Sequence, residues 1–174
     1  SARMAVEAAR AEIAMLAGCR GADVVFTSGG TEANNLALSV FDHVITSAVE
    51  HDSILRAVPD ATLVGVDADG RIDLDQLHDV LNALPDDKRR TTLVSVMYAN
   101  NETGVIQPIA ELATIAHAHD ALFHCDAVQA PGRVSVEMTA LGVDMMTLSA
   151  HKIGGPKGVG ALILAPGIDL HSTI

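Results

Sequence analysis

The chain has few cysteines, few basic residues and no long apolar run. Two cysteines in 174 residues provide no disulfide framework, which fits a reducing cytoplasm. Its 11 basic against 22 acidic residues give a net charge of −11, which argues against binding to nucleic acid or to an anionic membrane. No apolar run has the length of a membrane span, and no basic-then-apolar signal peptide opens the chain. We therefore expect a soluble cytoplasmic protein.

What is present is an apolar chain in which predicted helices and strands alternate. Apolar residues make up 49% of the sequence, enough for one domain with a sizeable core. The pattern predicts helices at residues 4–17, 31–40, 53–58, 73–84 and 109–119. It predicts buried strands at residues 24–27, 44–47, 62–66, 93–98, 122–125, 145–149 and 159–164. Residues 67–70 and 85–90 are expected to be loops. We expect an α/β fold of three layers, a mainly parallel mixed sheet flanked by helices.

One strand is expected to run against the others. Only nine residues separate Ser149 from Val159, and they contain no predicted helix. A parallel crossover needs a dozen residues or more. The strand at residues 159–164 should therefore be antiparallel to its neighbour.

A lysine in a glycine-rich context is the first candidate for chemistry. Lys152 follows the apolar strand at residues 145–149 and precedes Ile-Gly-Gly-Pro-Lys-Gly at residues 153–158. We expect its ammonium group to be partly desolvated there, which would lower its pKa and allow it to attack an aldehyde. The same pattern is also common for a solvated loop lysine, so the motif needs partners.

Two further motifs supply partners for an aldehyde-bearing phosphate such as pyridoxal phosphate. Asp126 ends a buried strand, where a carboxylate can keep a pyridine nitrogen protonated, although it can also simply cap the turn before Pro131. Gly29, Gly30 and Thr31 lie between a strand and a helix, a geometry that exposes backbone amides to a phosphate. Many strand-to-helix turns carry two glycines for geometry alone. The stretch matches neither a Walker loop nor a dinucleotide fingerprint.

Five segments together resemble a known family. They are Ser-Gly-Gly-Thr-Glu-Ala-Asn-Asn (28–35), Val-Glu-His (49–51), Ala-Asn-Asn-Glu-Thr-Gly-Val-Ile-Gln-Pro (99–108), His-Cys-Asp-Ala-Val-Gln (124–129) and Ser-Ala-His-Lys-Ile-Gly-Gly-Pro-Lys-Gly (149–158). In order and spacing they resemble the motifs of group I cysteine desulfurases, the NifS- and IscS-like enzymes of the class V aminotransferase superfamily. The resemblance implies that residues 1–174 form the large cofactor-binding domain of a fold type I pyridoxal-phosphate enzyme, without its N-terminal segment and C-terminal small domain.

The resemblance also implies a role for individual residues. Lys152 would bind pyridoxal phosphate as a Schiff base and later move protons at the substrate α-carbon. His51 would stack on the cofactor ring and act in acid–base transfer, while Asp126 would pair with the ring nitrogen. The ring and phosphate contacts would come from a larger set: Asn101 and Gln129 around the ring, and Gly30, Thr31, Ser149 and His151 on the phosphate. We expect no metal site, because His117 and His119 stand two residues apart on a helix, are expected to be solvated and cannot share a face.

The family's sulfur chemistry needs parts that are not recognisable here. Members use a cysteine on a mobile loop and an arginine that binds the substrate carboxylate, and neither Cys19 nor Cys125 matches that loop. By resemblance, the complete enzyme would be a homodimer that converts L-cysteine to L-alanine. It would pass sulfane sulfur to acceptor or scaffold proteins of iron–sulfur cluster or thiolation pathways. We expect the 174 residues alone to be inactive. The alternatives are another class V enzyme, such as a selenocysteine lyase, an aminotransferase or a kynureninase, and a non-catalytic domain that folds or pairs with another chain.

Overall fold

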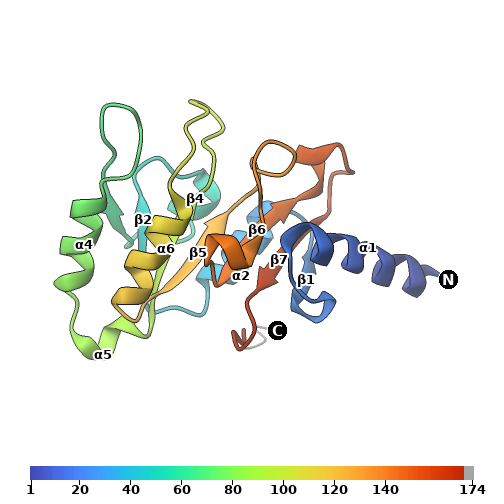
Figure 1. Cartoon of the computed structure of the whole chain (residues 1–174), viewed down its shortest axis with the longest axis horizontal. Helices are drawn as coiled ribbons and strands as arrows, with labels where there is room; N and C mark the ends of the chain where they lie inside the picture. The colour runs from blue at the N-terminus through green and yellow to red at the C-terminus, as the bar shows by residue number, and fades with distance from the viewer. Residues whose placement is uncertain (171–174) are drawn as a thin grey trace.

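The computed structural model describes residues 1–170 as one sheet covered by helices (Figure 1). The seven strands lie in the order β1-β7-β6-β5-β4-β2-β3. Their bounds are β1 Val24–Thr27, β2 His43–Ser47, β3 Thr62–Val64, β4 Thr92–Met97, β5 Leu122–Asp126, β6 Met145–Ser149 and β7 Gly160–Leu164. The α-helices are α1 Ala2–Ala17, α2 Gly30–Leu38, α3 Asp52–Leu55, α4 Leu74–Asn82, α5 Asp86–Arg89, α6 Ile109–Ala118 and α7 Met138–Leu141, and η1 Gly21–Asp23 and η2 Ala150–Ile153 are 3-10 helices.

Strand β7 is the reversed strand of the sheet, as its short connection predicted. It pairs antiparallel with both β6 and β1, whereas β3, β2, β4, β5 and β6 pair in parallel. The connection before it does contain the 3-10 turn η2, which the sequence did not predict. A single 3-10 turn is still too short to carry the chain back across the sheet.

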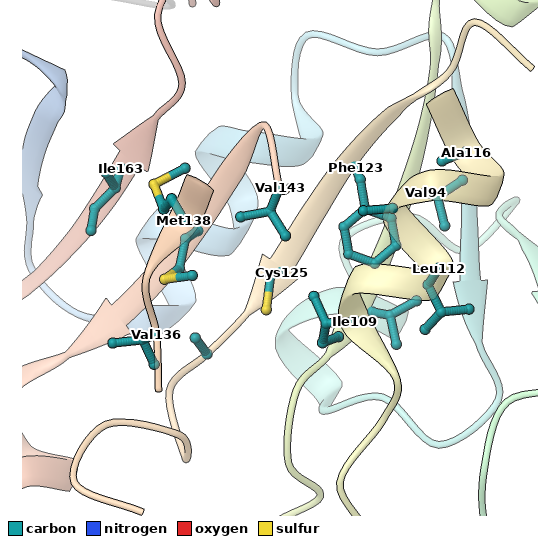
Figure 2. Close-up of a cluster of buried hydrophobic side chains, with 14 of the residues drawn as sticks. Val94, Ile109, Leu112, Ala116, Phe123, Cys125, Val136, Met138, Val143 and Ile163 are labelled. Atoms are coloured by element: carbon teal, nitrogen blue, oxygen red, sulfur yellow. The ribbon is translucent and has the colours of Figure 1, made fainter. Parts of the chain in front are cut away.

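Helices cover both faces of the sheet, which confirms the three-layer architecture. Apolar residues of α1, α4, α6 and α7 share one buried cluster with one face of the strands, and residues of α2 and α3 share a second cluster with the other face. On the first face Ile109 and Leu112 of α6 lie against Phe123 and Cys125 of β5 (Figure 2). Successive side chains of a strand point to opposite faces, so Asp126 points away from this cluster. None of the helices within residues 1–170 is both long and apolar enough to span a membrane.

Several local predictions were wrong. The segment 85–90 is not all loop, because Asp86 and Asp87 in the first turn and Lys88 and Arg89 in the last turn complement the dipole of the short helix α5. Helix α7 was missed. Strand β3 ends at residue 64, two residues early. The edge strands β1 and β3 are only partly buried, because a strand at the margin of a sheet is covered less completely than a central one.

The C-terminal end of α6 also differs from expectation. His119 is buried, and its Nε2 lies 3.0 Å from Asn82 Oδ1. His117 Nε2 lies 2.7 Å from Asp144 Oδ2. The prediction that both histidines are solvated is therefore wrong for His119, whereas His117 is exposed as expected and also contacts Asp144. These two contacts connect α6 to the end of α4 and to the residue before β6.

A glycine on β7 decides where the amino end of α2 lies. A Cβ on Gly160 would be 2.5 Å from the carbonyl carbon of Gly29, so the turn after β1 passes directly over β7. Because β7 separates β1 from β6, this crossing brings Gly30 beside Ser149 at the end of β6. Two segments far apart in the sequence thus meet at one edge of the sheet.

Candidate active site

A pocket of about 300 Å³ lies where the chain leaves β2, β4, β5 and β6. It is lined by all nine site residues predicted from the sequence: Gly30, Thr31, His51, Asn101, Asp126, Gln129, Ser149, His151 and Lys152. The rest of its wall consists of Asn34, Ser53, Met97, Ala99 and Val128. A larger hollow of about 820 Å³ lies beside α1 and contains none of the predicted residues. The pocket at the strand ends is therefore the candidate active site.

One corner of the pocket is built to receive an anion. Gly30 begins α2, where free backbone N–H groups and the helix dipole attract negative charge, and Thr31 adds a hydroxyl group. A Cβ at residue 30 would lie 2.8 Å from Val128 Cγ2 and 3.5 Å from Ser149 Cβ, so this close approach requires glycine. Ser149 Oγ lies 2.9 Å from His151 Nδ1 in the same corner. These groups suit a phosphate.

Asp126 places a buried carboxylate at the end of β5. Its Oδ2 accepts from Asn34 Nδ2 at 2.8 Å, and its Oδ1 accepts from the Val128 backbone N–H at 3.0 Å. Burial raises the pKa of Asp126, although these two hydrogen bonds and the nearby His51 oppose the shift. None of the ion pairs found within residues 1–170 involves Asp126. A buried carboxylate that lines a pocket without a cation fits a protonated ring nitrogen.

His51 follows β2 and caps the amino end of α3. Its Nδ1 accepts from the Ser53 backbone N–H at 3.0 Å and lies 2.9 Å from Ser53 Oγ. His51 is exposed and lines the pocket, so it is accessible to a ligand there. The capping bond explains why a histidine at this position has a fixed orientation.

Lys152 lies in the 3-10 turn η2 directly after β6. Its side chain lines the pocket but is exposed, so the partial desolvation expected from the sequence is not found. A turn after a strand leaves a side chain open to water unless another group covers it. Asn101 is likewise exposed, and Gln129 Oε1 accepts from Arg133 Nη1 at 3.2 Å.

Three residues at or behind the pocket were missed as functional candidates. Asn34 and Ser53 line the pocket and are buried, and Glu50 lies behind it. Glu50 Oε1 accepts from Ser47 Oγ at 2.6 Å and from the Met97 backbone N–H at 3.0 Å. Burial raises the pKa of Glu50 to about 8. Asn34 and Glu50 stood inside the recognised motifs, and their polarity next to apolar strands was the available signal.

Neither cysteine is placed or activated as a nucleophile. Cys125 is fully buried on the face of β5 opposite to Asp126, and burial raises its pKa well above the usual range. Burial also raises the pKa of Cys19, helped by the charge of Asp23. Both thiols therefore favour the protonated form, and neither lines the pocket. Within residues 1–170, no group of three or more His, Cys, Asp or Glu side chains is arranged to hold a metal ion.

Comparison with known proteins gives consistent matches over the chain. The family model for aminotransferase class-V matches residues 1–169. A cysteine desulfurase IscS of Dictyoglomus turgidum is 42% identical over 187 residues, covering 99% of this chain and 46% of the relative. A cysteine desulfurase of Sinorhizobium fredii is 40% identical over 190 residues, covering 100% of this chain and 48% of the relative.

Solved structures of other proteins also superpose on nearly the whole chain. A NifS-like protein from Rickettsia africae superposes with a TM-score of 0.93 at 38% identity, covering 99% of this chain and 50% of that chain. The protein SspA, solved in complex with cysteine, superposes with a TM-score of 0.85 at 32% identity, covering 99% and 53%. The chain thus spans about half the length of the relatives it matches.

Proposed function

The chain belongs to the class V aminotransferase family, and from this we infer that it is the pyridoxal-phosphate-binding domain of a cysteine desulfurase. One observation carries the inference. A single pocket joins an anion corner at the start of α2, the buried carboxylate of Asp126 and the amine of Lys152. These three groups match the phosphate, the ring nitrogen and the aldehyde of pyridoxal phosphate.

Each element of the pocket has a distinct task in this proposal. Pyridoxal phosphate supplies the electron sink that weakens bonds at the α-carbon of an amino acid. Asp126 would hold a proton on the ring nitrogen by its charge, and Lys152 would provide the amine that binds the aldehyde. The phosphate would be held by four residues, Gly30, Thr31, Ser149 and His151. Lys152 is also the base that can take or return a proton at the α-carbon.

The remaining predicted residues orient the ring. His51 presents a flat imidazole at the pocket wall, where it can stack on an aromatic ring and transfer a proton. Asn101 and Gln129 offer amide groups at the same wall for the ring substituents. The pocket brings together five separate segments of the chain, residues 30–34, 51–53, 97–101, 126–129 and 149–152.

L-cysteine is the proposed substrate. Relatives named cysteine desulfurase and the similar protein solved with cysteine support this choice. The reaction would yield L-alanine and transfer the sulfur to a thiolate, and from there to acceptor or scaffold proteins of iron–sulfur cluster or thiolation pathways. Because Cys19 and Cys125 lie outside the pocket, the accepting thiol must come from elsewhere. We therefore propose that residues 1–174 alone bind the cofactor without completing the reaction.

The cofactor assignment is tested by trapping. Wild-type protein incubated with pyridoxal phosphate should turn yellow, and borohydride should bleach the colour and leave the cofactor attached to the peptide that contains Lys152. Lys152→Ala should abolish labelling, whereas Lys157→Ala, in the same glycine-rich stretch, should not. Attachment to Lys157 or Lys88 would contradict the assignment, as would equal labelling of wild type and Lys152→Ala.

The reaction is tested by joining this chain to the carboxyl-terminal half of a cysteine desulfurase relative. Alanine and persulfide formed from cysteine in the joined protein, but not in the 174 residues alone, would support the proposal. Repeated turnover with a persulfide on Cys125 of the short chain would refute it. Alanine formed only from selenocysteine, or amino-group transfer instead of desulfuration, would favour another class V reaction.

A homodimer in the cytoplasm is the proposed setting. Helix α1 carries exposed apolar side chains, including Met4 at 71% and Met15 at 73%, which supports a partner surface on this helix. The two cysteines are free, which agrees with a reducing compartment. Sedimentation of the joined protein as a monomer at micromolar concentration would contradict the dimer.

A further inference from the structure

Asn34 on α2 connects two of the predicted site residues from inside the protein. Its side chain is 1% exposed, and its Nδ2 donates to Asp126 Oδ2 at 2.8 Å and to Ser53 Oγ at 2.9 Å. The amide nitrogen must face these two atoms, because the amide oxygen would otherwise lie against the Asp126 carboxylate. Both hydrogens of the Asn34 amide are therefore used, one on each partner.

The bond from Asn34 to Ser53 determines the direction of the next bond. Ser53 Oγ lies 2.9 Å from His51 Nδ1, and the Ser53 backbone N–H donates to the same ring nitrogen at 3.0 Å. A backbone N–H can only donate, so Nδ1 carries no proton. Since Ser53 Oγ already accepts from Asn34, its own hydrogen is free to point at Nδ1 as well. The neutral ring of His51 then keeps its proton on Nε2.

The oxygen of the Asn34 amide makes no comparable hydrogen bond. Its Oδ1 is buried and has no hydrogen-bond partner within residues 1–170. Burying an unpaired carbonyl oxygen is unfavourable, so packing alone would favour an apolar side chain at this position. The two N–H groups are what an apolar residue could not supply.

We propose that Asn34 is a positioning residue that orients the Asp126 carboxylate and, through Ser53, holds His51 as the neutral Nε2–H tautomer. The proposal rests on the proposed function, in which Asp126 and His51 contact the same cofactor ring. A neutral imidazole keeps a second positive charge away from a ring that is protonated beside Asp126. The same arrangement makes His51 a hydrogen-bond donor at Nε2. Asn34 thus links the electrostatics of both contacts.

The tautomer is tested in the protein without cofactor. Nitrogen NMR of the two ring atoms of His51, at a pH where histidine is neutral, should show Nδ1 unprotonated and Nε2 protonated in wild type. In Asn34→Leu and Ser53→Ala only the Ser53 backbone N–H still donates to Nδ1, so each variant should admit part of the Nδ1–H tautomer and move the two nitrogen shifts toward one another. Asn35→Leu, at the exposed neighbouring asparagine of α2, should leave them unchanged, and Ser53→Thr, which keeps the hydroxyl, should preserve the wild-type pattern.

Ser53→Ala keeps the proposal falsifiable if Asn34→Leu does not fold. Unchanged His51 shifts in Ser53→Ala would overturn the role of this hydrogen-bond chain, and so would a wild-type ring with its proton on Nδ1. Equal changes in Asn35→Leu would show a general disturbance of α2 and would also overturn it.

Binding of pyridoxal phosphate tests the link to Asp126. Asn34→Leu removes the hydrogen bond to the Asp126 carboxylate, so the dissociation constant of pyridoxal phosphate should rise about tenfold. Asn35→Leu should leave this dissociation constant unchanged. Equal affinity of wild type and Asn34→Leu would overturn the part of the proposal that concerns Asp126. A wild-type protein that binds no pyridoxal phosphate but shows the expected His51 tautomer would refute the proposed function and leave the assignment of Asn34 and His51 supported.

Discussion

Replacing Glu50 by glutamine should change how the stability of this protein depends on pH. Glu50 is 7% exposed, its pKa is raised from 4.5 to about 8, and the main cause is burial. Its Oε1 accepts two hydrogen bonds, while its Oε2 is buried and has no partner within residues 1–170. Glutamine keeps an accepting oxygen at the first position and cannot ionise. Glu50→Gln therefore removes the titration with little change in packing.

The sign and size of the effect follow from linkage. Between pH 4.5 and about 8 the folded protein keeps the Glu50 proton that the unfolded chain releases, so stability falls as pH rises through this window. At about 1.4 kcal/mol per pKa unit, the total loss in wild type is about 5 kcal/mol. Glu50→Gln should match wild type below pH 4.5 and exceed it by most of this amount above pH 8. That is a large share of a typical domain's total stability.

Urea unfolding from pH 5 to 9 measures the difference directly. The chain has no tryptophan, so circular dichroism of the backbone is the suitable signal. Glu111→Gln, at an exposed carboxylate of α6, is the matched control and should leave the pH dependence of stability as it is in wild type. The reasoning would be refuted if the difference in unfolding free energy between wild type and Glu50→Gln varied by less than about 1 kcal/mol from pH 5 to 9.

Three further predictions address the strands and the pocket. Burial lowers the pKa of His124 from 6.5 to about 3, so its contribution to stability is present above pH 6.5 and is lost as pH falls. His124→Gln should therefore reduce the loss of stability between pH 7 and 4. Urea unfolding that shows the same loss of stability over this range in wild type and His124→Gln would contradict this. Gly160→Ala should destabilise the fold by about 3 kcal/mol or more because its Cβ would meet the Gly29 backbone at 2.5 Å. Gly21→Ala, with its nearest contact at 3.7 Å, should stay within about 0.5 kcal/mol, and equal thermal unfolding of the two variants would count against the contact. In the protein joined to the carboxyl-terminal half of a relative, Asp126→Asn should lower both turnover and cofactor affinity, and the fold loss in turnover should be at least about ten times the fold loss in affinity. The reason is that asparagine keeps a hydrogen bond to the ring nitrogen but not the negative charge. Asp120→Asn is its control, and unchanged turnover in Asp126→Asn would remove that role.

The chemistry of the site could be predicted because each motif is local. Lys152 in its glycine-rich stretch, Asp126 at the end of a strand and Gly30 at the start of a helix are short patterns with their own physical meaning. The reversed direction of β7 followed from the length of one connection. These features depend on residues that are neighbours in the sequence.

Burial at particular positions could not be predicted in the same way. Lys152 was expected to be partly desolvated but is exposed, whereas Glu50, Asn34 and His119 are buried. Whether a polar side chain is covered depends on which distant segment packs over it. The short helix α5 was missed because a cluster of charges fits both a loop and a helical turn.

By itself, the sequence determined the strands, most of the helices, the groups available for chemistry and the family to which they belong. Only the tertiary structure decided how the groups meet. The strand order places β7 between β1 and β6, and the contact of Gly29 with Gly160 carries the start of α2 across to Ser149. Asn34 reaches Asp126 across 92 positions of the chain. Such contacts arise from the pairing and packing of whole elements, which local propensity does not specify.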